Sequence, residues 1–333
     1  MFSRFLKKLA TNKHEKTRRK NKKLFEFFRA FSWLILLAFS MFCAACTNFV
    51  QSSEPETEIV KQYIEPPKQK KFPASKTALR VCADPNNLPF SNEKGEGFEN
   101  KIAELVGKEM NLPVEYTWWA QRRGFFRNTL KAGLCDVVIG VPNSFEMALT
   151  TAPYYRSTYV FVSRKDRNLN IKSLDDAALK DLKIGALMIG DDGVNMPPVH
   201  ALNNRGIVKN VIGFSIYGDY KQANPPARIV DAVVNKDIDL AIVWGPLAGY
   251  FAQKEKTPLA LQPVSPQIDL PYLPFAYDIS MGVRRGEDEL KTQLEEVMAR
   301  KHSDVEKILD EYGVPRAETE QTTKTVALNK EGE

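Results

Sequence analysis

The chain has 333 residues, 43% of them hydrophobic, which is enough for two domains that each bury a core and argues against global disorder. Its formal net charge of +6 arises in the N-terminal stretch: residues 1–29 hold eleven Lys and Arg against two Glu, a net of +9, so the remainder carries −3. The body of the chain is therefore slightly acidic, which excludes the basic patch that a nucleic-acid-binding protein needs.

Residues 1–46 have the pattern of a secretory signal. The basic stretch precedes the uncharged run 30–45, which at sixteen residues is short for a membrane-spanning helix and ends in small residues. The sequence predicts export to the periplasm, with membrane contact only through this segment. Its end, Phe-Cys-Ala-Ala-Cys, resembles a lipobox that would place a lipid on Cys46, although Cys43 stands where Leu is usual. The alternatives are cleavage nearby and retention as an uncleaved anchor.

Two polar segments flank the folded body. Residues 47–77 contain Pro and charged residues without apolar periodicity, and residues 317–333 have the same character. We expect a flexible linker in the first segment and a disordered tail in the second.

Strand and helix patterns alternate between these segments. In a first series, strand-like runs at 79–83, 114–119 and 135–141 alternate with a helix that begins after Gly97 and a second helix around 124–132. The third run is fully apolar, which is typical of a buried parallel strand.

A second series follows the same alternation. It consists of strands at 183–189, 213–218 and 238–244 and helices near 198–204 and 226–237. Two such series separated by extended segments predict an α/β fold with two mostly parallel sheets, each flanked by helices.

Two extended segments, 159–163 and 277–283, are expected to cross between the series and act as hinges, and a final helix ends at Gly313. We expect lobe 1 to comprise residues 78–160 plus 276–316, and lobe 2 residues 161–275 with the hinge segments.

The cysteines of the body suggest a disulfide. With Cys43 and Cys46 in the export segment, Cys82 and Cys135 remain, and both lie in strand-like runs that a parallel sheet can place side by side. An oxidising compartment favours their pairing. The alternative is two buried free thiols. A metal site is not expected, because the body holds too few His and Cys at ligand spacing.

The order of motifs along residues 79–315 resembles the family-3 periplasmic solute-binding proteins. The motifs are the strand 79–83, Gly97-Phe98, the strand 133–138 and Pro153 to Tyr155. Several longer segments resemble the MoxJ-type subgroup, which is encoded beside quinoprotein methanol dehydrogenases. The resemblance implies a type II periplasmic binding protein fold, a non-enzymatic function without a cofactor, and a PQQ-dependent methanol dehydrogenase as partner.

Two departures from this family concern its ligand. Amino-acid-binding members hold the ligand's carboxylate with an Arg before the Pro-Tyr-Tyr motif, and its amino group with an Asp in the second lobe. No Arg occurs between Val141 and Tyr155, and Trp244 stands in the place of the Asp. Because a buried zwitterion needs both charges countered, an ordinary amino acid is not the expected ligand.

The candidate cleft is aromatic and polar instead. The residues that we expect to bind a ligand or partner are Asn86, Asn87, Phe90, Trp118, Trp119, Arg122, Arg123, Asp191, Asp192, Tyr217, Tyr220 and Trp244. Trp118 and Trp119 alternate on a strand, so one of them is expected in the core. The paired Asp are alternatively turn or capping residues, and the paired Arg alternatively a solvated helix entrance.

Three functions are compatible with these residues. The first is an accessory protein that binds a methanol dehydrogenase, and the second is the substrate-binding component of an ABC importer for a small solute. The third is a dehydratase-like enzyme that uses Glu99 or Glu146 as an acid, and the missing Arg anchor counts against it. Hydrolytic triads, phosphate-binding loops and metal motifs are absent from the sequence.

Overall fold

The structure, a computed structural model, describes residues 73–188, 196–215, 220 and 222–317, all within the compact unit Lys70–Glu333. The predicted export segment, with Cys46, lies outside the described residues. None of the described helices is long and apolar enough to cross a membrane.

The elements up to the middle of the chain are β1 (Leu79–Ala83), β2 (Asn86–Asn87), β3 (Ser91–Asn92), α2 (Phe98–Glu109), β4 (Val114–Trp118), α3 (Phe125–Asn128), β5 (Val137–Pro142), β6 (Leu149–Thr150), β7 (Tyr155–Arg164), and the 3₁₀ turns η1 (Lys165–Arg167) and η2 (Ala177–Lys180). The elements that follow are β8 (Ile184–Met188), α4 (Pro197–Asn204), β9 (Val211–Ser215), the 3₁₀ turn η3 (Pro225–Ala227), α5 (Arg228–Val234), β10 (Leu240–Trp244), α6 (Gly245–Lys254), β11 (Leu259–Pro263), β12 (Ile268–Asp269), β13 (Leu273–Pro274), β14 (Ala276–Val283), α7 (Asp288–Arg300) and α8 (His302–Glu311).

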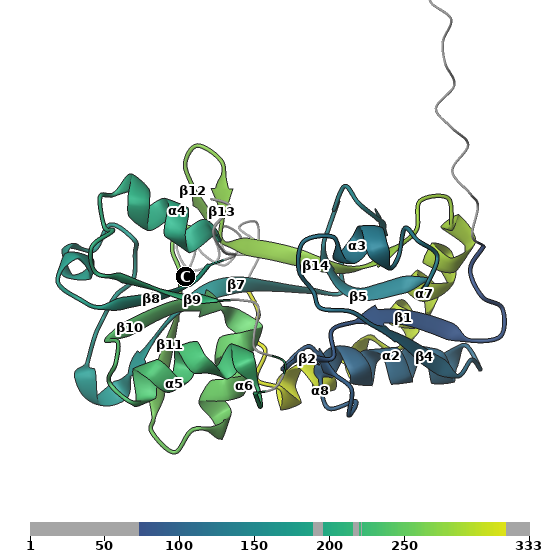
Figure 1. Ribbon diagram of the computed structural model, residues 1–333, viewed down its shortest axis with the longest axis horizontal. Helices are drawn as coiled ribbons and strands as arrows, with labels where there is room; N and C mark the ends of the chain where they lie inside the picture. Colours follow the sequence, from purple (N-terminus) through teal and green to yellow (C-terminus); the bar gives the residue numbers. More distant parts are fainter. Residues whose placement is uncertain (1–72, 189–195, 216–219, 221, 318–333) are drawn as a thin grey trace, which may run out of the picture. The chain divides into compact units, whose positions relative to one another are not determined.

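Two groups of strands form two lobes that share the strands β7 and β14. The strand order is β4-β1-β5-β14-β7-β10-β8-β9, with β11 paired to β7 and β6 paired to β14. Within the first lobe β1 pairs parallel with β4 and β5, and within the second β8 pairs parallel with β9 and β10. The first half of β7 pairs antiparallel with β14 and the second half with β10. Figure 1 shows β7 and β14 running between the lobes.

Helices cover both faces of each sheet. Successive residues of a strand point to opposite faces, so each strand packs against the helices on both. In the first lobe Val81 packs toward α2, α7 and α8, whereas Val138 packs with Phe125 beside α3. In the second lobe Val243 packs toward α5 and α6, whereas Ile242 packs toward α4. This arrangement is the predicted α/β fold of two flanked sheets, and the exact lobe boundaries stay a prediction.

Several elements differ from the expectation, and the helix α6 was not predicted. The last helix is two helices, α7 and α8, which meet at Lys301, whose ammonium lies 2.9 Å from the Glu109 carboxylate. The helix expected around 124–132 spans only Phe125–Asn128, and the Thr129 hydroxyl donates to the Phe125 carbonyl at its end. Strand β11 was not expected; it ends at Pro263 and lies at an edge of the sheet, where Pro is tolerated.

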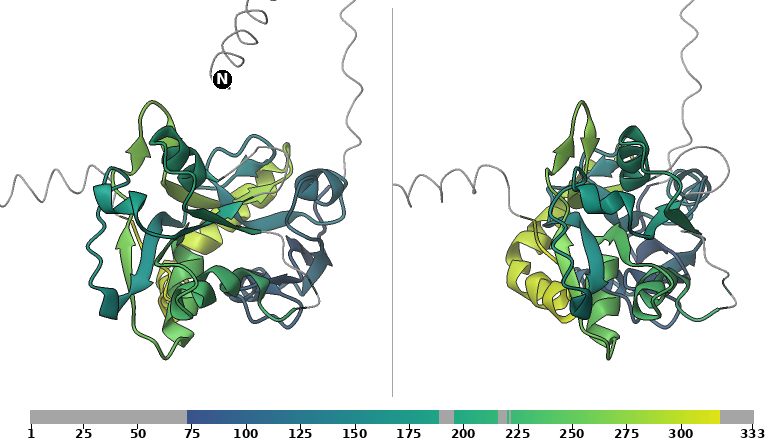
Figure 2. Two further views of the ribbon diagram at one scale, coloured as in Figure 1. Left: turned by 60° about the vertical axis from the view of Figure 1, so that its left-hand side comes forward. Right: turned by 90° about the vertical axis from the view of Figure 1, so that its left-hand side faces the viewer.

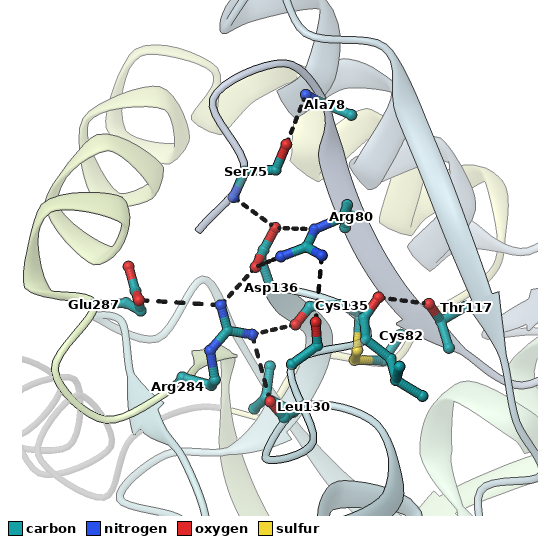
Figure 3. Close-up of polar contacts among 12 residues, drawn as sticks. Ser75, Ala78, Arg80, Cys82, Thr117, Leu130, Cys135, Asp136, Arg284 and Glu287 are labelled. Atoms are coloured by element: carbon teal, nitrogen blue, oxygen red, sulfur yellow. Dashed lines mark hydrogen bonds and ion pairs between the residues drawn. A yellow bond between two sulfur atoms is a disulfide. The ribbon is translucent and has the colours of Figure 1, made fainter. Parts of the chain in front are cut away.

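The predicted disulfide between Cys82 and Cys135 is present, with 5.5 Å between the two Cα atoms. It joins β1 to the segment that leads into β5, on the sheet face that packs against α3. Beside it lies the carboxylate of Asp136, which is 1% exposed (Figure 3).

Asp136 accepts hydrogen bonds from two arginines. The Arg80 guanidinium donates to both carboxylate oxygens at 2.7 Å, and Arg284 donates at 2.6 Å (Figure 3). The Ser75 amide donates a further bond. Arg284 also donates to the carbonyls of Leu130 and Cys135. Burial by itself would raise the pKa of Asp136, but the hydrogen bonds from Arg80 and Arg284 lower it below its ordinary value. This cluster ties β1, β5 and β14 together at one end of the first lobe.

Candidate functional site

A cavity of about 650 Å³ lies between the two lobes. Its first-lobe wall comes from the β2 region, the start of α2 and the end of β5, and its second-lobe wall from β8, α4 and the start of α6. The lining is largely apolar and consists of Asn87, Phe90, Glu99, Gln121, Gly140, Val141, Pro142, Phe145, Tyr155, Tyr159, Leu187, Met196, Pro197, Ser215, Pro226, Trp244, Leu247, Tyr277 and Ile279. Glu99 is the one charged side chain in this described lining. A ligand therefore meets apolar and aromatic surface with one acid.

Three aromatic side chains from the shared strands and β10 form one wall of the cavity. The ring of Trp244 meets the rings of Tyr159 and Tyr277 edge to face, at centroid distances of 5.4 and 5.8 Å. Tyr159 and Tyr277 lie on the strands that cross between the lobes, and Trp244 is the last residue of β10. We refer to Tyr159, Trp244 and Tyr277 as the aromatic cluster. Such packed aromatic groups are typical anchors for an apolar ligand or peptide side chain.

Glu99 lies in the first turn of α2 and enters the cavity opposite Gly140 of β5. A Cβ atom on Gly140 would stand 2.0 Å from the Glu99 Oε1 atom, so the absence of a side chain there makes room for the carboxyl group. The Glu99 side chain has no hydrogen bond or ion pair with any residue that the structure describes. Desolvation by the surrounding protein raises the pKa of Glu99 to about 8. The N-terminus of α2 stabilises the ionised carboxylate by only about 0.3 to 1 kcal/mol, which is too little to cancel this rise in the pKa.

The raised pKa makes the stability of the chain depend on pH. The folded chain keeps the Glu99 proton up to about pH 8, whereas the unfolded chain releases it near the ordinary value of 4.5. Stability from the neutral acid is therefore complete below pH 4.5 and is lost as the pH rises through 8. In the Glu99→Gln variant this loss is absent. Between about pH 5 and 9 we expect the wild type to lose at least about 1.4 kcal/mol relative to the variant, the equivalent of one pKa unit.

Urea unfolding of both proteins across this pH range measures the difference, with Glu146→Gln as a control because Glu146 is exposed. Parallel pH profiles for the wild type and Glu99→Gln would show that the carboxyl group is solvated like an ordinary surface acid.

Asp84 joins the two lobes at one side of the cavity. Its Oδ2 atom accepts hydrogen bonds from the Gln121 amide at 2.6 Å and from the Tyr220 hydroxyl of the second lobe at 2.8 Å. Nearby, the Asn86 side-chain amide donates to the Gln222 carbonyl at 2.9 Å. The contacts of Tyr220 and Gln222 each link residues 136 positions apart, and they hold the lobes together at this edge.

A second hollow of about 1100 Å³ lies on the other side of these contacts. Its lining mixes acidic and basic side chains with three tyrosines, including Glu93, Lys94, Lys101, Tyr220, Lys254 and Glu311. Charges of both signs on turns and helix ends are typical of a solvated surface. We therefore regard the aromatic cavity, although smaller, as the candidate site.

The structure brings only some of the predicted residues to this cavity. Asn87, Phe90 and Trp244 line it, and Asn86 and Tyr220 line the neighbouring hollow. Asp191, Asp192 and Tyr217 lie outside the described residues. Any role of these residues in binding stays a prediction.

Four predicted residues line neither hollow. Trp118 lies at the end of the edge strand β4, where its ring stacks on Tyr116 at 4.5 Å and packs toward the α2 side. Trp119 is 38% exposed, and Arg122 and Arg123 are exposed beside α3.

Sequence reasoning did not single out the tyrosines of the cavity. Tyr155 and Tyr159 are four residues apart on β7, so both point to one face of the strand, and Tyr277 lies on β14. The signal was present: these are the two predicted crossover strands, and side chains on strands that join the lobes necessarily lie beside the space between them. Glu99 was considered only as an enzymatic acid.

The fold and the cavity define a two-lobed α/β binding protein. Comparison with family models agrees, since the model of bacterial extracellular solute-binding proteins, family 3, matches residues 79–315, and the chain belongs to this family. The predicted type II periplasmic binding protein fold is confirmed.

Individual relatives show which subgroup of the family the chain resembles. Protein MoxJ of Methylorubrum extorquens is 32% identical over 252 residues, which cover 71% of this chain and 81% of the relative. The crystal structure of periplasmic binding protein XoxJ from Methylobacterium extorquens AM1 is 37% identical, covers 73% of this chain and 100% of that one, and has a TM-score of 0.60. The structure of MxaJ from Methlophaga aminisulfidivorans MPT is 26% identical with a TM-score of 0.63 and covers 72% of this chain and 100% of that one. The predicted resemblance to the MoxJ-type subgroup is confirmed.

Proposed function

We propose that this chain is an accessory protein that binds a PQQ-dependent methanol dehydrogenase in the periplasm, and that the cavity between its lobes receives a segment of that partner. The observation that carries the proposal is the described lining of the cavity, which is aromatic and apolar and has no Lys, Arg or His. The resemblance to MoxJ-type proteins supplies the identity of the partner.

The two alternative functions are less well supported by this lining. An importer component for amino acids needs a cation for the ligand's carboxylate, and the described lining offers none. Acid catalysis on an anionic substrate has the same requirement. Glu99 has a raised pKa suited to a general acid, but the described lining has no cation to hold such a substrate. Glu146 lies exposed outside the cavity.

Affinity purification from the periplasm of methanol-grown cells tests the proposal. A tagged full-length chain is expected to recover the dehydrogenase, and the Trp244→Ala variant to recover much less of it. Trp119→Ala is the matched control, because this tryptophan lies outside the cavity. Recovery of no dehydrogenase, together with saturable binding of a small solute, favours the importer component instead.

A second surface supports a protein partner. The hairpin of β12 and β13 stands away from the body in Figures 1 and 2 and carries Leu270, 83% exposed, and Tyr272, 90% exposed, at its tip. The strand directly before this tip is held in place, since Arg205 donates to both carboxylate oxygens of the buried Asp269 at 2.7 and 2.8 Å. Two apolar side chains exposed at the tip of a fixed hairpin do not help to enclose a small solute. Exposed apolar side chains of this kind are typical of protein–protein contacts.

We therefore expect the double variant Leu270→Ser, Tyr272→Ser to bind the dehydrogenase at least about tenfold more weakly, which corresponds to about 1.4 kcal/mol. Its thermal unfolding should be unchanged, because neither side chain is packed in a core. Surface plasmon resonance with immobilised dehydrogenase measures the affinity. Val208→Ser, at an exposed apolar position elsewhere on the second lobe, serves as the control. Equal affinities of the double variant and the control would remove the hairpin from the interface.

The location of the protein is part of the same proposal. We place the mature chain in the periplasm after export through residues 1–46, and its N-terminus has three alternatives: a lipid on Cys46, simple cleavage nearby, and an uncleaved anchor. Mass spectrometry of the mature N-terminus distinguishes a lipidated Cys46 from simple cleavage and from an uncleaved segment.

A further inference from the structure

The acid in the cavity has no partner of opposite charge within the described chain. Glu99 is the one charged side chain of the described lining, and it forms no hydrogen bond or ion pair there. A carboxyl group held in an apolar wall costs stability when it ionises, and a ligand that carries a positive charge removes this cost.

The shape of the cavity wall makes room for the Glu99 carboxyl group. Gly140 leaves a niche that fits the Glu99 carboxyl group, because any side chain at this position would collide with Oε1. The niche holds the acid at the cavity surface beside Gly140, near the C-terminal end of β5.

The rings around the cavity also favour a cation. The aromatic cluster lies in the same lining as Glu99, and an ammonium or guanidinium group is attracted to the faces of such rings. The described lining has no Lys, Arg or His to hold an anionic group, so a ligand with a free carboxylate is disfavoured.

We propose that the cavity binds a protonated amine or guanidinium carried on an apolar stem without a free carboxylate, with the charge against Glu99 and the stem against the aromatic cluster. A Lys or Arg side chain within a polypeptide has this chemistry, and so does a simple alkylamine. Since a segment of the dehydrogenase would present the side chain, this inference rests on the proposed function and specifies its ligand.

Calorimetric titration of the full-length chain with matched small probes tests the inference. The probes are n-hexylamine, 1-hexanol, hexanoate and Nα-acetyl-lysine N-methylamide. Each has an apolar stem, and the group at its end is a cation in the two amines, neutral in the alcohol and an anion in hexanoate. We expect n-hexylamine to bind at least tenfold more tightly than 1-hexanol, and hexanoate not to bind. Tighter binding of the blocked lysine than of hexylamine indicates a polypeptide source, and the reverse indicates a free amine.

Two variants assign the charge to Glu99. Glu99→Gln should weaken hexylamine binding at least tenfold and leave hexanol unchanged. Gly140→Ala, which displaces the carboxyl group while keeping its charge, should also weaken hexylamine binding. Thermal unfolding verifies that both variants fold, and should either fail to do so, the wild-type preference for amine over alcohol still decides the charge. Equal binding of amine and alcohol by the wild type, or of hexylamine by the wild type and folded Glu99→Gln, overturns the inference.

These outcomes are separable from the fate of the proposed function. Glu99-dependent amine binding without a dehydrogenase complex supports the ligand class and contradicts the partner. A dehydrogenase complex that is unaffected by Glu99→Gln, with no amine preference, supports the partner and overturns the ligand class.

Discussion

Replacement of Asp136 by alanine is expected to lower the free energy of unfolding by about 3 to 5 kcal/mol, the usual cost of removing one partner from a buried ion pair. Asp136 is 1% exposed and accepts hydrogen bonds from Arg80 and Arg284, and Arg284 is itself only 8% exposed. Without the Asp136 carboxylate, the buried Arg284 loses the acid 2.6 Å from its guanidinium, and the Glu287 carboxylate lies 4.0 Å from it. Urea unfolding followed by circular dichroism measures the loss.

The matched control is Asp166→Ala, which removes a carboxylate from an exposed pair with Arg164. We expect a much smaller loss there, because the Asp166 side chain is 59% exposed and water solvates its carboxylate. The lowered pKa of Asp136 also fixes how its contribution to the free energy of unfolding depends on pH. The contribution is complete above the ordinary carboxyl pKa of 3.8 and is lost as the pH falls through the lower pKa of the folded chain. Equal losses for the two alanine variants would mean that the Asp136 cluster is solvated and not structural.

Removal of the disulfide is the second change with a large expected effect. Cys82 and Cys135 are 53 residues apart, and closing a loop of this length restricts the unfolded chain by about 3 to 4 kcal/mol in the chain-entropy model. The Cys82→Ala, Cys135→Ala variant is therefore expected to unfold with that much less free energy than the oxidised wild type.

A reductant provides the control for this experiment. Dithiothreitol should destabilise the wild type and have no effect on the double alanine variant, so the two proteins converge under reducing conditions apart from the small change in packing. A wild type that is equally stable with and without reductant would show that the bond contributes nothing to folding.

The fold was predictable because it depends on local periodicity. Fully apolar runs such as 137–141 and 240–243 indicate buried parallel strands, and the helices between them carry one apolar face. The predicted elements are wrong where the same local pattern fits two structures, such as one long helix or two shorter ones. The continuous apolar spacing from Leu290 to Leu309 does not show that Lys301 ends one helix and begins the next, since the ion pair of Lys301 with Glu109 joins distant parts of the chain.

The candidate site was less predictable, because it is built from contacts between distant residues. In sequence Glu99 is an ordinary acid in the first turn of a helix, and only the fold shows that Gly140 provides its niche. The Tyr220 to Asp84 bond spans 136 positions. Trp118 resembled a cleft residue by type, but the strand order places β4 at the edge of the sheet, away from the shared strands β7 and β14 that line the cavity.

The absence of the family's amino-acid anchors is a prediction from the sequence alone, because it concerns residue types at motif positions. Trp244 occupies the end of β10, and in the structure its ring contributes to the aromatic cluster instead of a charge. The cavity wall at this position is therefore aromatic and uncharged.

Binding of the purified full-length chain to a purified PQQ-dependent methanol dehydrogenase tests the central claim most directly. In sedimentation-velocity titrations we predict a complex that the wild type and Trp119→Ala form equally well, and that folded Trp244→Ala forms at least about tenfold more weakly, a difference of about 1.4 kcal/mol. No complex at protein concentrations of about 50 μM, where even weak specific interfaces are populated, would contradict the proposed function.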